Sequence, residues 1–530
     1  MSAWSRVVIL AALTGSASAF PRTMLCQEAP MWGNLERGAH AVGFRQLLLR
    51  DPSRPTLPLE EGQPAPDDGG RQMQIVFWYP AVSATGSALT YGDYVARTAQ
   101  ELDFSPLDAS RVRAANERLV KRAADFRGDT LALRATLPRL LRMSVLGRLN
   151  ARAARGKFPL VIFPEGQTPA LNQILGEYLA SHGYVVASTS TKGSFDTQIE
   201  YWSPRGMEAM AADLRFVIAA LDTIVFVDTR RIGVMGVGIN ASGALALQMR
   251  TPAVRALVSL EGGITTQGEM DLIGRTPYFD IGAIRVPILA ITAPHPSVDA
   301  ARLDLYRYST RHLVHFPTMG EFWFLDYGML ERYVPGIIGA APGDTNAGYE
   351  WGARFTRRFF DGYLRGDAAA LQWIERDAAA LNAPAGLFTV TTKRGLPAPP
   401  TITALKALIS SGGAAAVVRL VDERAARDSQ PIAQDYFVEL NSWLAVGRDS
   451  SGRERHELAR LRVRLHPRSA RAHYSLGQSA NRQNDRALAR THLNEALKLL
   501  PTDTDPSLVP TLRQAIERAA TEALAALGTQ

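Results

Sequence analysis

Short apolar runs alternate with amphipathic segments between residues 158 and 315, and this alternation constrains the fold more than any other feature. Residues 160–163 and 184–188 are short apolar runs, as expected of strands buried on both faces. Residues 172–182 between them have helical spacing and end at Gly183. The same reading places strands at 232–235, 256–260, 288–292 and 312–315 and a long helix at 207–222. The pattern predicts an α/β fold, with a mostly parallel sheet covered by helices on both faces.

The chain before residue 158 has a different character. Strands are expected at 42–49 and 73–79, separated by a turn-rich connection. Residues 111–157 contain 13 lysines or arginines and only three acidic residues. Helical leucine spacing, interrupted by Pro138, predicts two or three short helices there. We expect 96–157 to form a basic helical insert that covers a site as a lid, although an arginine-rich solvated face is the ordinary alternative.

The first residues predict export. Arg6 precedes an apolar run and the small residues Ala17, Ser18 and Ala19, the pattern of a signal peptide cleaved after residue 19. The mature protein is therefore expected in the periplasm or outside the cell. One cysteine, Cys26, cannot form an internal disulfide. No membrane span is expected after the signal peptide, and no nucleic-acid recognition motif is visible.

Residues 231–243 read as a strand, a sharp turn and the start of a helix. In a Gly-x-Ser-x-Gly elbow, such a turn exposes a nucleophilic serine above the sheet. The first glycine here is Gly236, so the serine position falls on Gly238 and the second glycine position on Asn240. Glycine has no side chain that could attack a substrate.

Four segments carry a family resemblance. They read Val-Gly-Phe-Arg at 42–45, Ile-Val-Phe-Trp-Tyr-Pro-Ala at 75–81, Phe-Pro-Leu-Val-Ile-Phe at 158–163 and Phe-Phe-Asp-Gly-Tyr-Leu-Arg-Gly-Asp at 359–367. In this order and spacing they resemble bacterial dienelactone hydrolases, which are similar to platelet-activating-factor acetylhydrolases within the α/β-hydrolase superfamily. The resemblance covers roughly residues 38–395. It implies an α/β-hydrolase fold and, for an intact member, a serine-type carboxylic ester hydrolase without a cofactor.

The resemblance also locates the oxyanion region. The family turn after 160–163 usually reads Ser-His-Gly, whereas this chain has Glu165, Gly166 and Gln167 after Pro164. A carboxylate there would oppose a developing oxyanion, which requires hydrogen-bond donors. Val237 and Ile239, which flank the elbow position, belong to the same region.

The triad positions implied by the resemblance are degenerate. Gly238 replaces the nucleophile, Glu261 occupies the acid position as a conservative change, and Glu321 falls on the histidine. A serine nucleophile needs a base that removes its proton, so both chemical partners are missing.

Other residues could supply a triad. Ser242 lies about one helical turn beyond the elbow position and would point along the helix. His295 and His315 are the nearest candidate bases, although His315 lies inside an expected strand and suits a structural histidine. Asp299 is an alternative acid, although a surface-loop position is its ordinary reading.

The glutamates form a pattern of their own. Glu165, Glu261 and Glu321 fall at loop ends above the carboxyl edge of the sheet, where this architecture binds ligands. Neighbouring carboxylates raise one another's pKa or bind a cation; alternatively, each is solvated or paired with an arginine of the insert. We assign no metal to them.

After residue 400 the chain becomes almost wholly helical. Residues 469–501 follow the pattern of a tetratricopeptide unit, in which large residues of one helix meet small residues of the next. The matching positions are Leu476, Gly477, Ala480, Ala489, Leu493, Ala496 and Pro501. We expect a tetratricopeptide-like helical domain at 401–530 that could bind a protein partner.

The sequence therefore predicts a signal peptide at 1–19, an α/β-hydrolase domain at 28–395 and a helical domain at 401–530. The favoured function is a non-catalytic pseudohydrolase that binds a small ligand, an ester or a partner at the degenerate triad. One alternative is an active carboxyl-ester or lipid-ester hydrolase that uses Ser242 and His295. Another is a scaffold whose helical repeats bind proteins.

Overall fold

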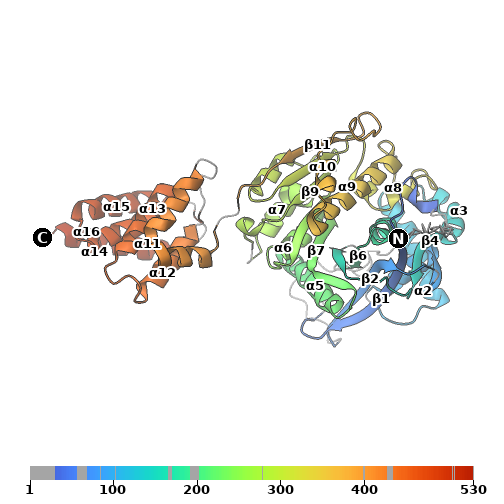
Figure 1. Cartoon of the computed structure of the whole chain (residues 1–530), viewed down its shortest axis with the longest axis horizontal. Helices are drawn as coiled ribbons and strands as arrows, with labels where there is room; N and C mark the ends of the chain where they lie inside the picture. Colours follow the sequence, from blue (N-terminus) through green and yellow to red (C-terminus); the bar gives the residue numbers. More distant parts are fainter. Residues whose placement is uncertain are drawn as a thin grey trace, which may run out of the picture.

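The computed structural model describes most of the chain, and Figure 1 shows its α/β part and its C-terminal helices. The described residues are 30–55, 69–83, 85–101, 103–164, 170–190, 202–276, 279–397, 400–425, 432, 434–503, 505 and 508–528. The expected signal peptide, Cys26, Glu165, Gly166 and Gln167 lie outside them, so what we expect of these residues stays a prediction.

In the described part, eleven strands form one sheet, in the order β11-β10-β9-β8-β7-β5-β6-β2-β1-β4-β3. The strands are β1 (Ala41–Asp51), β2 (Arg71–Ala81), β3 (Ser87–Thr90), β4 (Ser144–Leu149), β5 (Phe158–Pro164), β6 (Val185–Thr189), β7 (Val227–Val237), β8 (Val254–Leu260), β9 (Ile288–Thr292), β10 (Arg311–His315) and β11 (Thr389–Lys393). Neighbouring strands from β6 to β10 are parallel, whereas β2 is antiparallel to both β1 and β6. This is the arrangement of an α/β-hydrolase sheet, and the predicted fold class is confirmed.

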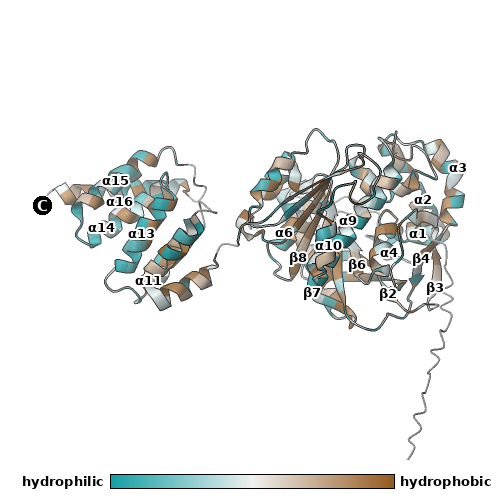
Figure 2. Cartoon of the chain, turned by 45° about the horizontal axis from the view of Figure 1, so that its top comes forward, coloured by the Kyte–Doolittle hydropathy of each residue, from teal (hydrophilic) through white to brown (hydrophobic). Residues whose placement is uncertain are grey.

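Helices cover both faces of the sheet because its central strands are apolar on both sides. Along β5, Val161 and Phe163 face a core shared with α4 and α9, whereas Leu160 and Ile162 face a core shared with α5 and α6. Figure 2 shows the hydrophobic colour of the central strands β7 and β8. The helices of this part are α1 (Tyr91–Arg97), α2 (Ala109–Asp125), α3 (Thr130–Leu141), α4 (Gln173–Ser181), α5 (Pro204–Asp222), α6 (Ile239–Gln248), α7 (Gln267–Gly274), α8 (Tyr327–Leu330), α9 (Thr345–Arg365) and α10 (Ala368–Trp373).

The basic insert differs from its prediction, because it is not wholly helical. Strand β4 pairs in parallel with β1, and β3 pairs antiparallel with β4, so this part of the chain extends the sheet edge. Helix α3 also continues through Pro138. The end of α2 reaches the loop that follows β10, where the ring centroids of Phe126 and Phe322 are 4.2 Å apart. The insert thus contacts Phe322, the residue after Glu321. Its role as a lid stays a prediction.

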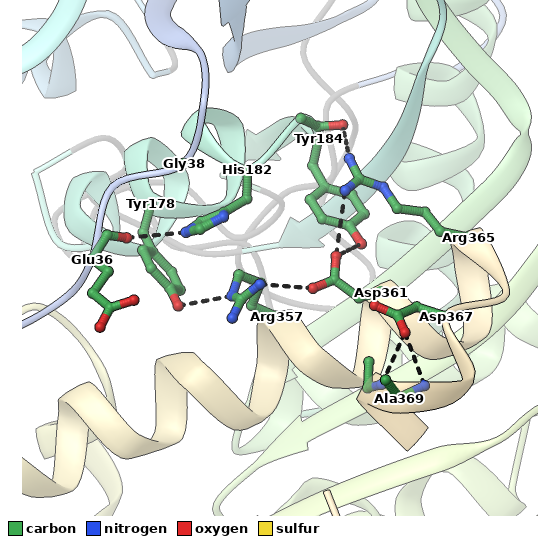
Figure 3. Close-up of polar contacts among 12 residues, drawn as sticks. Glu36, Gly38, Tyr178, His182, Tyr184, Arg357, Asp361, Arg365, Asp367 and Ala369 are labelled. Carbon is green, nitrogen blue, oxygen red and sulfur yellow. Dashed lines mark hydrogen bonds and ion pairs between the residues drawn. The ribbon is translucent and has the colours of Figure 1, made fainter. Parts of the chain in front are cut away.

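A polar network attaches α9 to α4 and to the amino end of the central strand β6 (Figure 3). The carboxylate of Asp361 accepts a 2.7 Å hydrogen bond from the Tyr184 hydroxyl and lies 2.9 Å from the Arg357 guanidinium. Arg357 also donates to the hydroxyl of Tyr178 in α4, and Arg365 forms a second ion pair with Asp361 at 3.4 Å. The network holds α4, β6 and α9 together at the amino end of β6, whereas the elbow follows the carboxyl end of β7.

The C-terminal part is helical and has hydrophobic cores of its own. Its helices are α11 (Ile402–Ala425), α12 (Gln434–Ala445), α13 (Arg453–Leu465), α14 (Ala470–Arg482), α15 (Arg486–Leu499) and α16 (Pro510–Gly528). A β-carbon on Gly477 would lie 2.7 Å from Cγ of Leu493, so α14 and α15 meet through a small and a large residue as expected. Assignment of this pair as a tetratricopeptide unit stays a prediction.

Among the described helices, α11 alone has a length and composition that would allow it to cross a membrane, which is weak evidence by itself. Its backbone leaves the helical conformation at Gly413, where φ is 67°. Leu405 and Val421, on either side of this break, are buried in a core with α12 and α13. The element is therefore a broken helix packed against its neighbours.

Candidate functional site at the strand-to-helix elbow

The elbow is formed where β7 turns into α6 through Gly238. The φ and ψ angles of Gly238 are 50° and −132°, a combination that residues with a side chain rarely adopt. Its N–H donates to the carbonyl oxygens of Leu260, at 3.0 Å, and Glu261, at 2.8 Å. The strained turn expected of a nucleophile elbow is thus present, with a glycine at its apex.

Close packing explains the glycines around this turn. A β-carbon on Gly236 would collide with the backbone of Asn240 and Ala241 at the start of α6. A β-carbon on Gly263 would lie 2.5 Å from the carbonyl oxygen of Gly238. Backbone contacts on two sides therefore hold the elbow in place.

Glu321 lies directly against the apex of the elbow. It begins a short 3₁₀ helix, η6 (Glu321–Phe324), that follows β10. A β-carbon built on Gly238 would lie only 2.5 Å from Oε1 of Glu321. The two residues therefore lie close together. Their assignment to the nucleophile and base positions of a triad stays a prediction.

Glu261 follows β8 and is the second carboxylate of the site. Its backbone has a positive φ of 41°, and its side chain is buried. Oε1 has no hydrogen-bond partner in the part of the chain that the structure describes. Burial raises the pKa of this carboxyl to about 8, with further contributions from the negative charges of Glu321 and Glu269.

Glu269, in the first turn of α7, is a third carboxylate that the sequence analysis did not identify. Its Oε1 lies 3.9 Å from the position of a β-carbon on Gly238. Its side chain accepts hydrogen bonds from the Thr266 hydroxyl and the Gly263 N–H. Burial, followed by the charge of Glu321, raises its pKa to about 7. In the sequence, an acidic residue here signals only the start of a helix, so no local pattern could have found it.

Carboxylate oxygens of Glu321 and Glu269 therefore lie 2.5 and 3.9 Å from the β-carbon position of Gly238, and Glu261 is close enough to interact electrostatically with both. Carboxylates this close cannot all be ionised at little cost, and with pKa values of about 8 and 7 Glu261 and Glu269 retain protons near neutral pH. Within the described residues, no group of three or more His, Cys, Asp or Glu side chains has a geometry that could hold a metal ion.

The alternative triad residues lie in different surroundings. Ser242 is fully buried within α6, and its hydroxyl has no hydrogen-bond partner among the described residues. His295 is exposed, and its Nδ1 accepts a hydrogen bond from the Ser297 N–H at 3.2 Å. Asp299 caps a 3₁₀ helix by accepting from the Ala301 N–H at 2.9 Å. A substrate could not reach Ser242 without displacing α6, so this geometry speaks against its use as a nucleophile.

The flanking residues Val237 and Ile239 are both buried beside the elbow. Their side chains pack into the cores at the end of β7 and the start of α6. They position the turn rather than offering functional side chains.

No family model and no curated protein matches this chain. Among solved structures, the chain is similar to a ferulic acid esterase from Streptomyces cinnamoneus. The two share 21% sequence identity over 68% of this chain and 99% of that chain, with a TM-score of 0.47. The fold assignment rests on the strand order and the strand-to-helix elbow.

Proposed function

We propose that this protein is a non-catalytic descendant of an α/β-hydrolase that binds a ligand at the former nucleophile elbow. The observation that carries the proposal is the 2.5 Å separation between Glu321 Oε1 and the β-carbon position of Gly238. The nucleophile has no side chain, and the group at the base position occupies the space that a nucleophile would need. We retain the expectation that the mature protein is exported.

The carboxylates of the site determine the class of ligand that we propose. Glu261, Glu269 and Glu321 offer acceptor oxygens. Burial, followed by the charge of Glu321, raises the pKa of Glu261 and Glu269. A ligand with an ammonium or guanidinium group would donate hydrogen bonds and neutralise this charge. We propose such an organic cation as the ligand.

Loss of esterase chemistry is tested with the full chain. We expect no labelling by a fluorophosphonate probe and no turnover of p-nitrophenyl acetate above the buffer rate. An intact serine hydrolase serves as the positive control. Stoichiometric labelling would show that a reactive serine exists and would overturn the non-catalytic proposal.

Cation binding is tested by calorimetry with agmatine, which carries both kinds of cationic group, and with n-butanol as a neutral control. Binding should release protons at pH 7.5, because a cation lowers the raised pKa values of Glu261 and Glu269. The apparent enthalpy should therefore change with the ionisation enthalpy of the buffer. Glu321→Gln should weaken binding by about tenfold, as expected for loss of one charged hydrogen bond. Equal binding of both compounds, or no effect of Glu321→Gln, would refute the cationic ligand.

A further inference from the structure

A cavity of about 230 Å³ lies between helices α12, α13, α14 and α16 of the C-terminal part. Four arginines line it, two from α13 and two from α14: Arg455, Arg462, Arg471 and Arg482. The members of each pair are seven and eleven residues apart, which is about two and three helical turns. Each helix therefore presents both of its arginines on one side, toward the cavity.

The charge of the cavity is positive. No acidic side chain lines it in the described part of the chain. Two carboxylates lie just outside, where Asp449 is 3.2 Å from Arg455 and Asp505 is 3.8 Å from Arg471. Among the described residues that line the cavity, four are arginines and none is acidic, so the lining itself carries positive charge.

Burial of an arginine strengthens its attraction for an anion in the cavity, because little water screens the charge. Arg462 is only 5% exposed, so little water screens its guanidinium group from the cavity. Arg482, at the last turn of α14, is exposed and gives the cavity a charged rim. An anion that enters would meet charged donors both at the rim and inside.

The rest of the wall is divided between polar and apolar side chains. Ser475, Gln478 and Ser479 from α14 line it as neutral polar residues. Gln478 already donates to the Tyr474 hydroxyl, and the Ser479 hydroxyl is hydrogen-bonded to His456. Leu512 and Ile516 from α16 line the cavity as apolar residues. Inorganic phosphate has no apolar part that could pack against Leu512 and Ile516.

We infer that this cavity binds a small organic anion. Its carboxylate or phosphate group would meet the arginines, whose planar guanidinium groups match both anions. Its apolar part would pack against Leu512 and Ile516. The site is separate from the elbow and does not depend on the function proposed there.

The experiment is calorimetric titration of the full chain with phenyl phosphate and with benzoate, with phenol as the neutral control. We expect one of the two anions, or both, to bind at a single site while phenol does not. Affinity should fall as the salt concentration rises. The anion that binds more tightly identifies the preferred head group, phosphate or carboxylate. Absence of binding by both anions, or equal binding of phenol, would overturn the inference.

Variants locate the site. In the double variant Arg471→Gln/Arg482→Gln, affinity should fall at least about tenfold, because charged hydrogen bonds are lost. Arg460→Gln is the matched control, since Arg460 is exposed on α13 and does not line the cavity. Arg482→Gln alone changes only an exposed side chain and keeps the test valid if the double variant unfolds. Wild-type affinity in folded Arg482→Gln and Arg471→Gln/Arg482→Gln variants would refute the cavity as the site.

Discussion

Oε1 of Glu321 lies 2.5 Å from the place where Gly238 would carry a β-carbon. These residues are far apart in the sequence, yet the glutamate fills the space beside the elbow that a serine would require. A serine side chain at position 238 would therefore collide with the carboxylate of Glu321. The same separation determines which second substitution a serine at position 238 would require.

Gly238→Ser alone should not create an esterase, because the new side chain would meet Glu321 and would have no base. Gly238→Ser combined with Glu321→His should place a hydroxyl beside an imidazole, with Glu261 available to orient it. Triad members act as a unit, so fluorophosphonate labelling should appear only in the double variant. Glu321→His alone is the control. If a well-folded double variant shows no labelling, even after the further change Glu165→His, our triad placement is wrong.

Stability should fall as pH rises through the range in which Glu261 titrates. Its pKa is raised from 4.5 to about 8 in the folded protein, so the folded state binds more protons than the unfolded state between these values. The free energy of unfolding is therefore highest below pH 4.5 with respect to this group and decreases up to about pH 8, by at most about 1.4 kcal/mol per pH unit.

Glu261→Gln should flatten this dependence, because the amide does not titrate. Urea unfolding from pH 5 to pH 9 measures the effect, with Glu522→Gln on the exposed surface of α16 as the control. If the free energy of unfolding changed with pH equally in wild type and Glu261→Gln, the result would contradict the raised pKa of Glu261.

Ser242→Ala should leave any residual ester turnover unchanged and should not destabilise the fold. The hydroxyl is fully buried without a hydrogen-bond partner among the described residues, so its removal should stabilise by up to about 1 kcal/mol. Urea unfolding gives the free energy, and turnover is measured on the same preparation. A folded variant that lost turnover or labelling shown by wild type would establish Ser242 as a nucleophile.

Asp361→Ala should destabilise the protein by roughly 3 kcal/mol, because it leaves Tyr184 and Arg357 without their shared carboxylate. Asp304→Ala is the matched control. Its partner Lys393 is 54% exposed and Asp304 itself 53%, so this change should cost less than about 0.5 kcal/mol. Similar costs in thermal or urea unfolding would show that the network in Figure 3 contributes no more than a surface ion pair.

Local patterns in the sequence determined the strands and the sharp strand-to-helix turn with Gly238 at its apex. Burial on both sides of a strand requires an apolar run, and a tight strand-to-helix turn requires glycine at Gly236, so both are readable from a few adjacent residues. The same reasoning failed for β4, whose place at the sheet edge depends on pairing with β1, a segment about 100 residues earlier.

Only the tertiary structure decided what surrounds the elbow. The chain turns back after β8 through three residues with positive φ, Glu261, Gly262 and Gly263, and this turn brings Glu269 to the site. The raised pKa of Glu261, the position of Glu321 against Gly238 and the arginine-lined cavity of the C-terminal helices depend on distances between separate elements. Such distances are set by how helices and strands pack, which the periodicity of any one segment does not encode.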